Sequence, residues 1–285
     1  MILPLQALWL AAHGAFRSMG FRSQTLRVGA RSLHVYDARG QGTSPPVLLV
    51  HGMGGNAAGF VYIARALLRA SRRVAAVELP GHGRSRLSRG ETPATIVQAG
   101  EGVAAALAGL GEPAVLIGSS LGGAISLFTA AAVPASVAAV VGLNPAGAPL
   151  QGSDRDAVLE AFRGGSVRAA LEMNRRLYSR PPRLTWWFAR GLGKHWASAP
   201  VQQFASEIRG GYPGLGPELL STVRQPVLIL WGEEDRILPA HSVDYFRAHL
   251  PHATVELVPR SGHLPMVERP RLVAERVSHF LRELS

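Results

Sequence analysis

The stretch Ala114-Val115-Leu116-Ile117-Gly118-Ser119-Ser120-Leu121-Gly122 joins an apolar run to the small-residue run 123–132. The first run is typical of a buried strand and the second of a helix. A strand-to-helix turn this tight forces its central residue, Ser120, into a strained backbone conformation and leaves the hydroxyl group exposed. Gly118 and Gly122 flank it because a larger side chain would collide where the helix and the strand nearly touch. The stretch therefore predicts an α/β fold with a serine presented at the end of a strand.

Apolar runs and helical patterns alternate along most of the chain. Short apolar runs bounded by turn residues predict strands, and the amphipathic stretches between them predict helices. The predicted strands cover residues 24–28, 33–38, 47–50, 74–79, 114–117, 137–143, 227–231 and 254–258. The predicted helices cover residues 60–68, 94–110, 123–132, 243–250 and 272–284. This alternation predicts a mostly parallel eight-stranded sheet with helices on both faces.

The alternation stops between residues 148 and 223. This segment has helical patterns, no clear strand and several aromatic residues, and it is too long for a simple connection. We therefore expect a helical cap insertion after the sixth strand. The predicted organisation is an N-terminal amphipathic helix (1–23), a first part of the core (24–147), the cap (148–223) and a second part of the core (224–285).

Two late loops carry the partners that a reactive serine needs. A serine hydroxyl is a poor nucleophile until a base takes its proton, and the base needs a carboxylate to fix its tautomer. Of the ten histidines, His263 alone follows a late strand in a short glycine-containing loop. Asp235 follows the seventh predicted strand, and the other place for an acid, after the sixth strand, holds Asn144. The chain therefore predicts a catalytic triad of Ser120, Asp235 and His263.

The glycine-rich run His51-Gly52-Met53-Gly54-Gly55 follows the third predicted strand. A tetrahedral oxyanion needs two preorganised backbone N–H groups. We expect one from Leu121 and the other from Met53, with Gly52 and Gly54 letting the backbone approach the substrate. His51 is expected to hydrogen-bond loop backbone. A phosphate cradle is the alternative use of such a run, but the Gly-Lys-Ser/Thr ending is missing.

Five motifs occur in a fixed order: HGMGG (51–55), ELPGHGRS (78–85), GSSLGG (118–123), GEEDRILP (232–239) and SGHLP (261–265). With them the chain resembles the α/β-hydrolase fold family over roughly residues 24–284. Within that family it is similar to serine esterases and lipases of the monoacylglycerol-lipase and bacterial lipase type. The resemblance implies Ser120 as nucleophile, Asp235 as acid, His263 as base, and Met53 with Leu121 as oxyanion-hole donors. Glu78 stands where relatives usually carry aspartate, at a position that looks structural.

A serine at the turn, rather than the aspartate of dehalogenases and epoxide hydrolases of this fold, indicates acyl chemistry. We expect hydrolysis of a small-molecule carboxylic ester through an acyl-enzyme, with no cofactor and no metal site. The aromatic cap favours an apolar acyl group, and Trp186 and Trp187 are predicted to contact it. Two alternatives stay open: a C–C bond hydrolase acting on ring-cleavage products, and a catalytically silent ligand-binding homologue.

The net charge is +11, from 30 basic and 19 acidic residues. Of the basic residues only Lys194 is a lysine, a bias that indicates a GC-rich, bacterial genome. The arginines are scattered and accompany no recognition motif, so we expect no nucleic-acid partner. The absence of cysteine excludes disulfides and thiolate chemistry. The oligomeric state is not indicated.

The first twenty residues are apolar but lack the positively charged start of a signal peptide. No uninterrupted apolar run reaches the ~18 residues of a membrane-spanning helix, so we expect a cytoplasmic protein. Five side chains fall on one face of the predicted N-terminal helix: Leu5, Leu8, Trp9, Ala12 and Phe16. This face either packs on the protein's own domain or lies on a lipid surface as a peripheral membrane contact.

Overall fold

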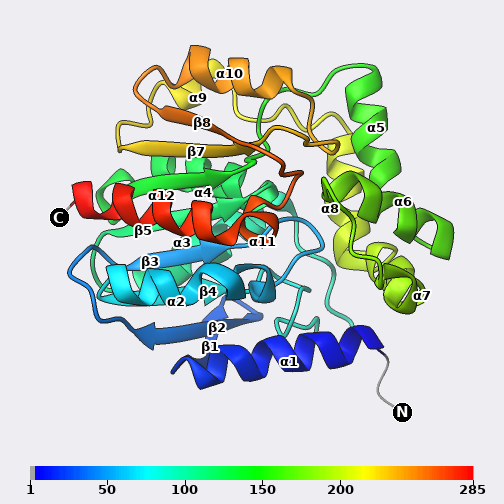
Figure 1. The fold of residues 1–285 in the computed structure, drawn as a ribbon, viewed down its shortest axis with the longest axis horizontal. Helices are drawn as coiled ribbons and strands as arrows, with labels where there is room; N and C mark the ends of the chain where they lie inside the picture. Colours follow the sequence, from blue (N-terminus) through cyan, green and yellow to red (C-terminus); the bar gives the residue numbers. More distant parts are fainter. Residues whose placement is uncertain (1–3, 285) are drawn as a thin grey trace.

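One sheet of eight strands runs through the protein (Figure 1). The computed structural model describes residues 4–284. The strands are β1 (Arg22–Val28), β2 (Arg31–Arg39), β3 (Val47–Val50), β4 (Arg73–Val77), β5 (Ala114–Ser119), β6 (Val137–Leu143), β7 (Val227–Gly232) and β8 (Thr254–Val258). Their order across the sheet is β1-β2-β4-β3-β5-β6-β7-β8. Only β2 pairs antiparallel with its neighbours, so the predicted mostly parallel sheet is confirmed.

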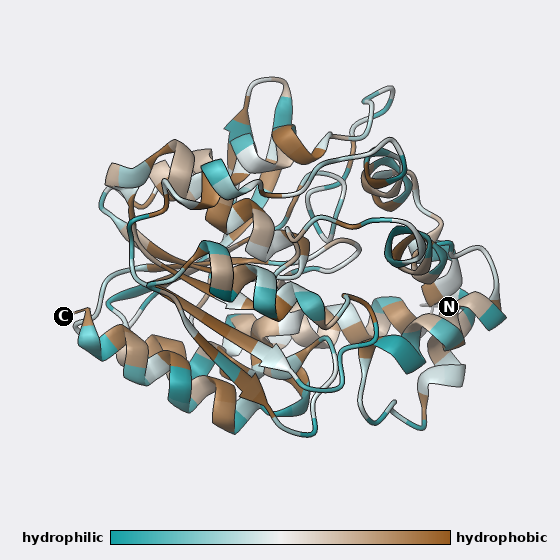
Figure 2. Ribbon diagram, turned by 90° about the horizontal axis from the view of Figure 1, so that it is seen from above, coloured by the Kyte–Doolittle hydropathy of each residue, from teal (hydrophilic) through white to brown (hydrophobic). Residues whose placement is uncertain are grey.

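Helices cover both faces of this sheet. One face carries α3 (Ile96–Ala108), α4 (Leu121–Ala132) and α10 (His241–His249), and the other carries α2 (Val61–Ala70) and α12 (Pro270–Glu283). In β3, Leu48 and Val50 pack into the first core while Val47 and Leu49 pack into the second. A strand buried on both faces has to be apolar throughout. Figure 2 shows the strands as hydrophobic and the helices as mixed, with hydrophilic residues on the outside.

The segment between β6 and β7 is helical, as the sequence predicts. It contains α5 (Ser153–Ala161), α6 (Val167–Leu177), α7 (Thr185–Trp196), α8 (Ala199–Arg209) and the short α9 (Pro217–Leu220). Figure 1 shows α5 to α8 gathered at one end of the sheet. By contrast, α9 contacts the core helix α4 and buries Leu220. The division of the chain into core and cap stays a prediction.

The N-terminal helix α1 (Pro4–Ser18) packs on the protein's own domain through part of its apolar face. Leu5 and Phe16 are buried, and Trp9 is half-buried. Leu8, which the helical spacing places on the same face, is instead 52% exposed. Residues 1–3 of the predicted helix lie outside the described residues. No helix within residues 4–284 is both long and apolar enough to cross a membrane.

Three short elements complete the fold. They are the 3-10 helices η1 (Ala57–Phe60) and η2 (Pro134–Ser136) and the one-turn helix α11 (Pro265–Glu268). The start of η1 is capped by the side chain of Asn56, which accepts a hydrogen bond from the N–H of Ala58. Both η1 and α11 immediately follow loops that carry the chemistry described next.

Candidate active site

Ser120 lies at the turn between β5 and α4 with backbone angles φ 53° and ψ −121°. Few non-glycine residues adopt such angles, because the side chain collides with the backbone. The turn is held by the N–H of Ser120, which donates to the carbonyl oxygen of Leu143 over 3.0 Å. A β-carbon on Gly122 would lie 2.2 Å from the carbonyl oxygen of Val50. The glycine is therefore required where α4 starts against the end of β3.

Asp235 and His263 come together from the loops after β7 and β8. The Oδ2 atom of Asp235 lies 2.8 Å from Nδ1 of His263, and the two side chains are 2% and 3% exposed. The second oxygen, Oδ1, accepts hydrogen bonds from the N–H groups of Ile237 (2.7 Å) and Leu238 (3.1 Å). Because Nδ1 faces the carboxylate, Nε2 is the nitrogen of His263 that is left to take a proton from a nucleophile.

The charge state of Asp235 follows from these contacts. Burial raises the pKa of its carboxyl group, but the charge of His263 and the hydrogen bonds from His263, Ile237 and Asn144 outweigh burial and lower the pKa. Asp235 is therefore ionised at neutral pH. An ionised acid beside Nδ1 stabilises the imidazolium that forms when His263 accepts a proton.

Asn144 is a part of the site that sequence reasoning missed. Its Nδ2 donates to Oδ2 of Asp235 over 2.6 Å, and its Oδ1 accepts from the N–H of Gly232 over 3.0 Å. The residue is fully buried and has φ 43°. From the sequence, Asn144 shows only that no carboxylate follows the sixth strand, and no role of its own is predicted for it. Its place directly after β6, the strand that neighbours β7, was the signal that it would reach Asp235.

The His263 loop is bonded to the helical segment between β6 and β7. The N–H of His263 donates to the carbonyl oxygen of Leu177, at the end of α6, over 2.9 Å. The carboxylate of Glu268 accepts from the N–H of Gly262 (2.6 Å) and from the N–H of Arg180 (3.2 Å). The contacts of Leu177 and Arg180 with this loop join residues almost ninety positions apart, so no local pattern predicts them.

The glycine-rich run forms a tight turn, closed by a hydrogen bond from the N–H of Gly55 to the carbonyl oxygen of Gly52 over 2.9 Å. A β-carbon on Gly52 would lie 2.9 Å from Cβ of Ser120, so this turn lies against the serine. Within residues 4–284 the N–H of Met53 has no hydrogen-bond partner. Leu121 begins α4, and the N–H of a first helical residue has no partner inside its helix.

His51 holds loop backbone, as expected. Its Nδ1–H donates to the carbonyl oxygen of Gly52 (2.8 Å), and its Nε2 accepts from the N–H of Leu79 (3.0 Å). One nitrogen donates and the other accepts, which requires the neutral ring. Burial lowers the pKa of His51 and keeps it neutral.

Trp186 and Trp187 are exposed, unlike the buried residues of the site. They are 62% and 57% exposed and lie against each other with ring centroids 4.8 Å apart. Their contact with a substrate stays a prediction. The tryptophan of α7 that reaches the glycine-rich turn is Trp196: a β-carbon on Gly54 would lie 2.1 Å from its ring. Gly54, the other predicted substrate-binding glycine, is thus packed against this ring.

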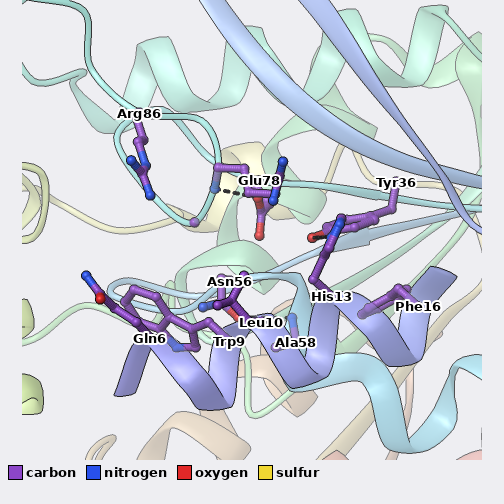
Figure 3. A pocket seen from close by; sticks show the side chains of 12 residues that line it. Gln6, Trp9, Leu10, His13, Phe16, Tyr36, Asn56, Ala58, Glu78 and Arg86 are labelled. Carbon is purple, nitrogen blue, oxygen red and sulfur yellow. Dashed lines mark hydrogen bonds between the residues drawn. The ribbon is translucent and has the colours of Figure 1, made fainter. Parts of the chain in front are cut away.

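Glu78 has a structural position, as the sequence suggests. Its carboxylate accepts from the N–H groups of Arg84 (2.6 Å) and Ala57 (3.4 Å) and so joins two loops. Burial raises the pKa of Glu78, but the ring of His34, whose Nδ1 lies 3.3 Å from Oε2, and the hydrogen bond from the N–H of Arg84 outweigh burial and lower the pKa. Glu78 also faces a cavity of about 250 Å³ between α1 and these loops (Figure 3). Within residues 4–284 no three metal-ligating side chains gather to hold an ion.

Comparison with known proteins identifies the family. The profile of the Alpha/beta hydrolase family matches residues 47–276. The chain belongs to this family. It is 32% identical, over 99% of its length and 75% of the relative's, to the dihydrolipoyllysine-residue acetyltransferase component of the acetoin cleaving system of Pseudomonas putida. It is 27% identical to Lipase 1 of Psychrobacter immobilis, over 91% of its length and 83% of the lipase's.

The solved structures agree with this assignment. The structure of a membrane phospholipase A, described as a bacterial virulence factor, superimposes with a TM-score of 0.82 at 27% identity and covers 98% of this chain and 91% of that one. The chain is thus an esterase- or lipase-like α/β hydrolase.

Proposed function

We propose that the protein is a serine hydrolase that cleaves carboxylic esters with an apolar acyl group through an acyl-enzyme. The observation that carries the proposal is the buried contact of 2.8 Å between Asp235 and His263, at the same edge of the sheet as the strained Ser120. Relatives named as lipase, phospholipase and acetyltransferase support acyl chemistry.

In the proposed mechanism, Nε2 of His263 takes the proton of the Ser120 hydroxyl as Oγ attacks the ester carbonyl. Asp235 stabilises the imidazolium through Nδ1. The oxyanion is bound by the N–H groups of Met53 and Leu121, for neither of which residues 4–284 supply another hydrogen-bond partner. His263 then returns the proton to the leaving alcohol, and water releases the acid by the reverse sequence.

The test is a panel of p-nitrophenyl esters of rising chain length, assayed with wild type, Ser120→Ala and Ser119→Ala. Ser119 is a matched control because its Oγ is buried and has no hydrogen-bond partner among the described residues. We expect Ser120→Ala to lose about 10⁴-fold or more in kcat, and Ser119→Ala to stay close to wild type. Substantial turnover by Ser120→Ala would overturn the proposal.

The two alternatives give different outcomes in the same assay. A C–C hydrolase would prefer a ring-cleavage dienoate over every ester in the panel. A silent binding protein would turn over neither the esters nor the dienoate, and its Ser120 would not be labelled by a phosphonate. Substrate preference therefore separates the ester hydrolase from the C–C hydrolase, and mass spectrometry of the labelled protein separates both from a silent binding protein.

A peripheral membrane contact forms a separate part of the proposal. Large apolar side chains are exposed on α1 and at the start of α7, two helices that contact each other: Leu8, Leu10, Leu184, Trp186 and Trp187. Such side chains insert at the lipid headgroup boundary. We expect the protein to sediment with anionic vesicles, and the double change Trp186→Ala, Trp187→Ala to weaken this, while Val97→Ala, an exposed residue of α3, does not. No sedimentation at low salt would exclude the contact.

A further inference from the structure

Three histidines hold the glycine-rich turn, and one of them comes from α7. His51 binds the carbonyl of Gly52, as described above. The N–H of Gly54 donates to Nε2 of His82 over 3.1 Å, and Nδ1–H of His82 donates to the carbonyl oxygen of Pro80. The carbonyl oxygen of Gly54 accepts from Nε2–H of His195 over 2.6 Å. Gly54 is therefore fixed on both its N–H and its carbonyl side.

His195 is in turn held between two aromatic rings. Its ring centroid lies 5.1 Å from that of Trp9 on α1, at an interplanar angle of 75°, and 5.3 Å from that of its neighbour Trp196. An edge-to-face contact of this kind orients a ring as well as burying it. The same tryptophan, Trp196, packs directly on the Cα of Gly54. The contacts thus run without a gap from the N-terminal helix to the turn.

The contact through Trp9 lies beside open space. Figure 3 shows Trp9 at one end of the cavity that α1 lines, with His13 and Phe16 at the other end. At that second end Phe16 stacks on Tyr36, and Nδ1 of His13 is hydrogen-bonded to the Tyr36 hydroxyl over 3.0 Å. Since these contacts and the buried side chain of Leu5 also hold α1, we expect the helix to stay in place when Trp9 is replaced.

We propose that His195 and Trp9 are positioning residues for the oxyanion-hole donor Met53. Trp9 fixes the ring of His195, His195 fixes the carbonyl of Gly54, and the turn then presents the preceding N–H group of Met53 to the oxyanion. This inference rests on the proposed function. An oxyanion donor acts only within a narrow range of distance, and a displacement of about 1 Å costs on the order of 10²-fold in rate.

The experiment compares His195→Ala, His195→Gln, Trp9→Ala and the double alanine variant. Two exposed neighbours on the same helices, Lys194→Ala on α7 and Gln6→Ala on α1, are the matched controls. The readouts are kcat and KM for a short soluble ester, and the rate at which a phosphonate labels Ser120. The phosphonate oxygen occupies the oxyanion site, so labelling reports on the turn without requiring full turnover. Melting temperatures are measured alongside.

For His195→Ala we expect kcat and the labelling rate to fall about 10- to 100-fold with KM nearly unchanged. His195→Gln keeps an N–H donor and should recover most of the loss. Trp9→Ala should lower kcat and the labelling rate less than His195→Ala does. In the His195→Ala background it should lower neither any further, because Trp9 acts through the ring of His195. A merely structural role would lower the melting temperature and leave kcat and the labelling rate unchanged.

Two results would overturn the inference, and they differ from failure of the proposed function. One is a labelling rate for His195→Ala within twofold of wild type. The other is a loss of kcat and labelling rate from Trp9→Ala that is as large in the His195→Ala background as in the wild type. In both cases wild-type Ser120 is labelled and only the positioning role fails. If the phosphonate does not label Ser120 in the wild type, the proposed function and this inference fall together.

Discussion

Replacing Ser120 by glycine should stabilise the protein relative to replacing it by alanine. The backbone angles of Ser120, φ 53° and ψ −121°, lie in a region that costs a residue with a β-carbon on the order of 1–3 kcal/mol. Alanine keeps the β-carbon and therefore the strain, whereas glycine releases it. Both variants lack the nucleophile, so the comparison separates stability from activity at this position.

The magnitude follows from the same pair of changes at Ser119. This neighbour ends β5, is also buried and has no positive φ. At either position glycine costs about 0.5–1 kcal/mol of backbone entropy relative to alanine, and loss of the buried methyl group costs about 0.8 kcal/mol. Subtracting the alanine-to-glycine change at Ser119 from that at Ser120 cancels both costs. The remainder, about 1–3 kcal/mol in favour of glycine at 120, is the strain.

The assay is urea unfolding of the four variants, followed by tryptophan fluorescence and circular dichroism at one temperature. The slopes against urea must agree among the variants, because the free energies of unfolding are compared by extrapolation. A difference between the two positions below about 0.5 kcal/mol, within the usual additivity error, would refute the claim that the turn stores strain at Ser120. An alanine-to-glycine change that destabilises the protein more at position 120 than at position 119 would refute the claim outright.

Three further outcomes follow from the site. Asp235→Asn should lower kcat by about 10⁴-fold while Glu234→Gln, whose side chain is 40% exposed, stays near wild type in the ester assay. Asn144→Ala removes a hydrogen bond to a carboxylate and should lower the free energy of unfolding at pH 7 by about 1.5–3 kcal/mol. Because the pKa of Asp235 is lowered in the fold, its contribution is present above its unfolded pKa and is lost as pH falls. In Asn144→Ala that pKa rises, so acid unfolding followed by circular dichroism should begin at a higher pH. Gly54→Ala should lower the melting temperature more than Gly29→Ala: both have positive φ (67° and 57°), but only the first meets an indole ring at 2.1 Å.

Most of the fold could be predicted because its strands are buried on both faces. For β3 and β6, which are buried almost throughout, the predicted and observed residues coincide. The strand predicted to end at residue 79 stops at Val77, because Glu78 turns its carboxylate to the amides of Arg84 and Ala57. The predicted helix 94–110 is shorter, since Thr95 and Gln98 form a capping box that begins it at residue 96.

The site could be predicted only where a residue lies in a recognisable loop motif at the end of a strand. Ser120, Asp235 and His263 each follow a strand in a motif, and the structure brings the last two into contact. Asn144 and His195 carry no motif. The hydrogen bond from His195 to Gly54 spans 141 positions between a helix and a loop, and periodicity reports which face of a helix is buried, never which distant carbonyl it meets.

The helices beside the site should not open as a free lid, and this gives a last prediction. Hydrogen bonds join the segment between β6 and β7 to the catalytic loops, and three of them are 3.2 Å or shorter: His263 N–H to Leu177, Arg180 N–H to Glu268, and His195 to Gly54. At about 0.5–1.5 kcal/mol net for each bond, separating all three costs about 1.5–4.5 kcal/mol. The open state is then roughly one molecule in ten to one in two thousand.

Hydrogen exchange followed by mass spectrometry measures this opening directly. The peptide that contains the amide of His263 should be protected by about the same factor, 10 to 10³, and a protected amide there means that Leu177 is in place. Exchange of that amide at the rate of an unfolded peptide would show that α6 leaves the His263 loop freely. Substrate would then enter by displacement of these helices. Protection in the expected range requires instead that substrate reach Ser120 while the three bonds stay largely intact.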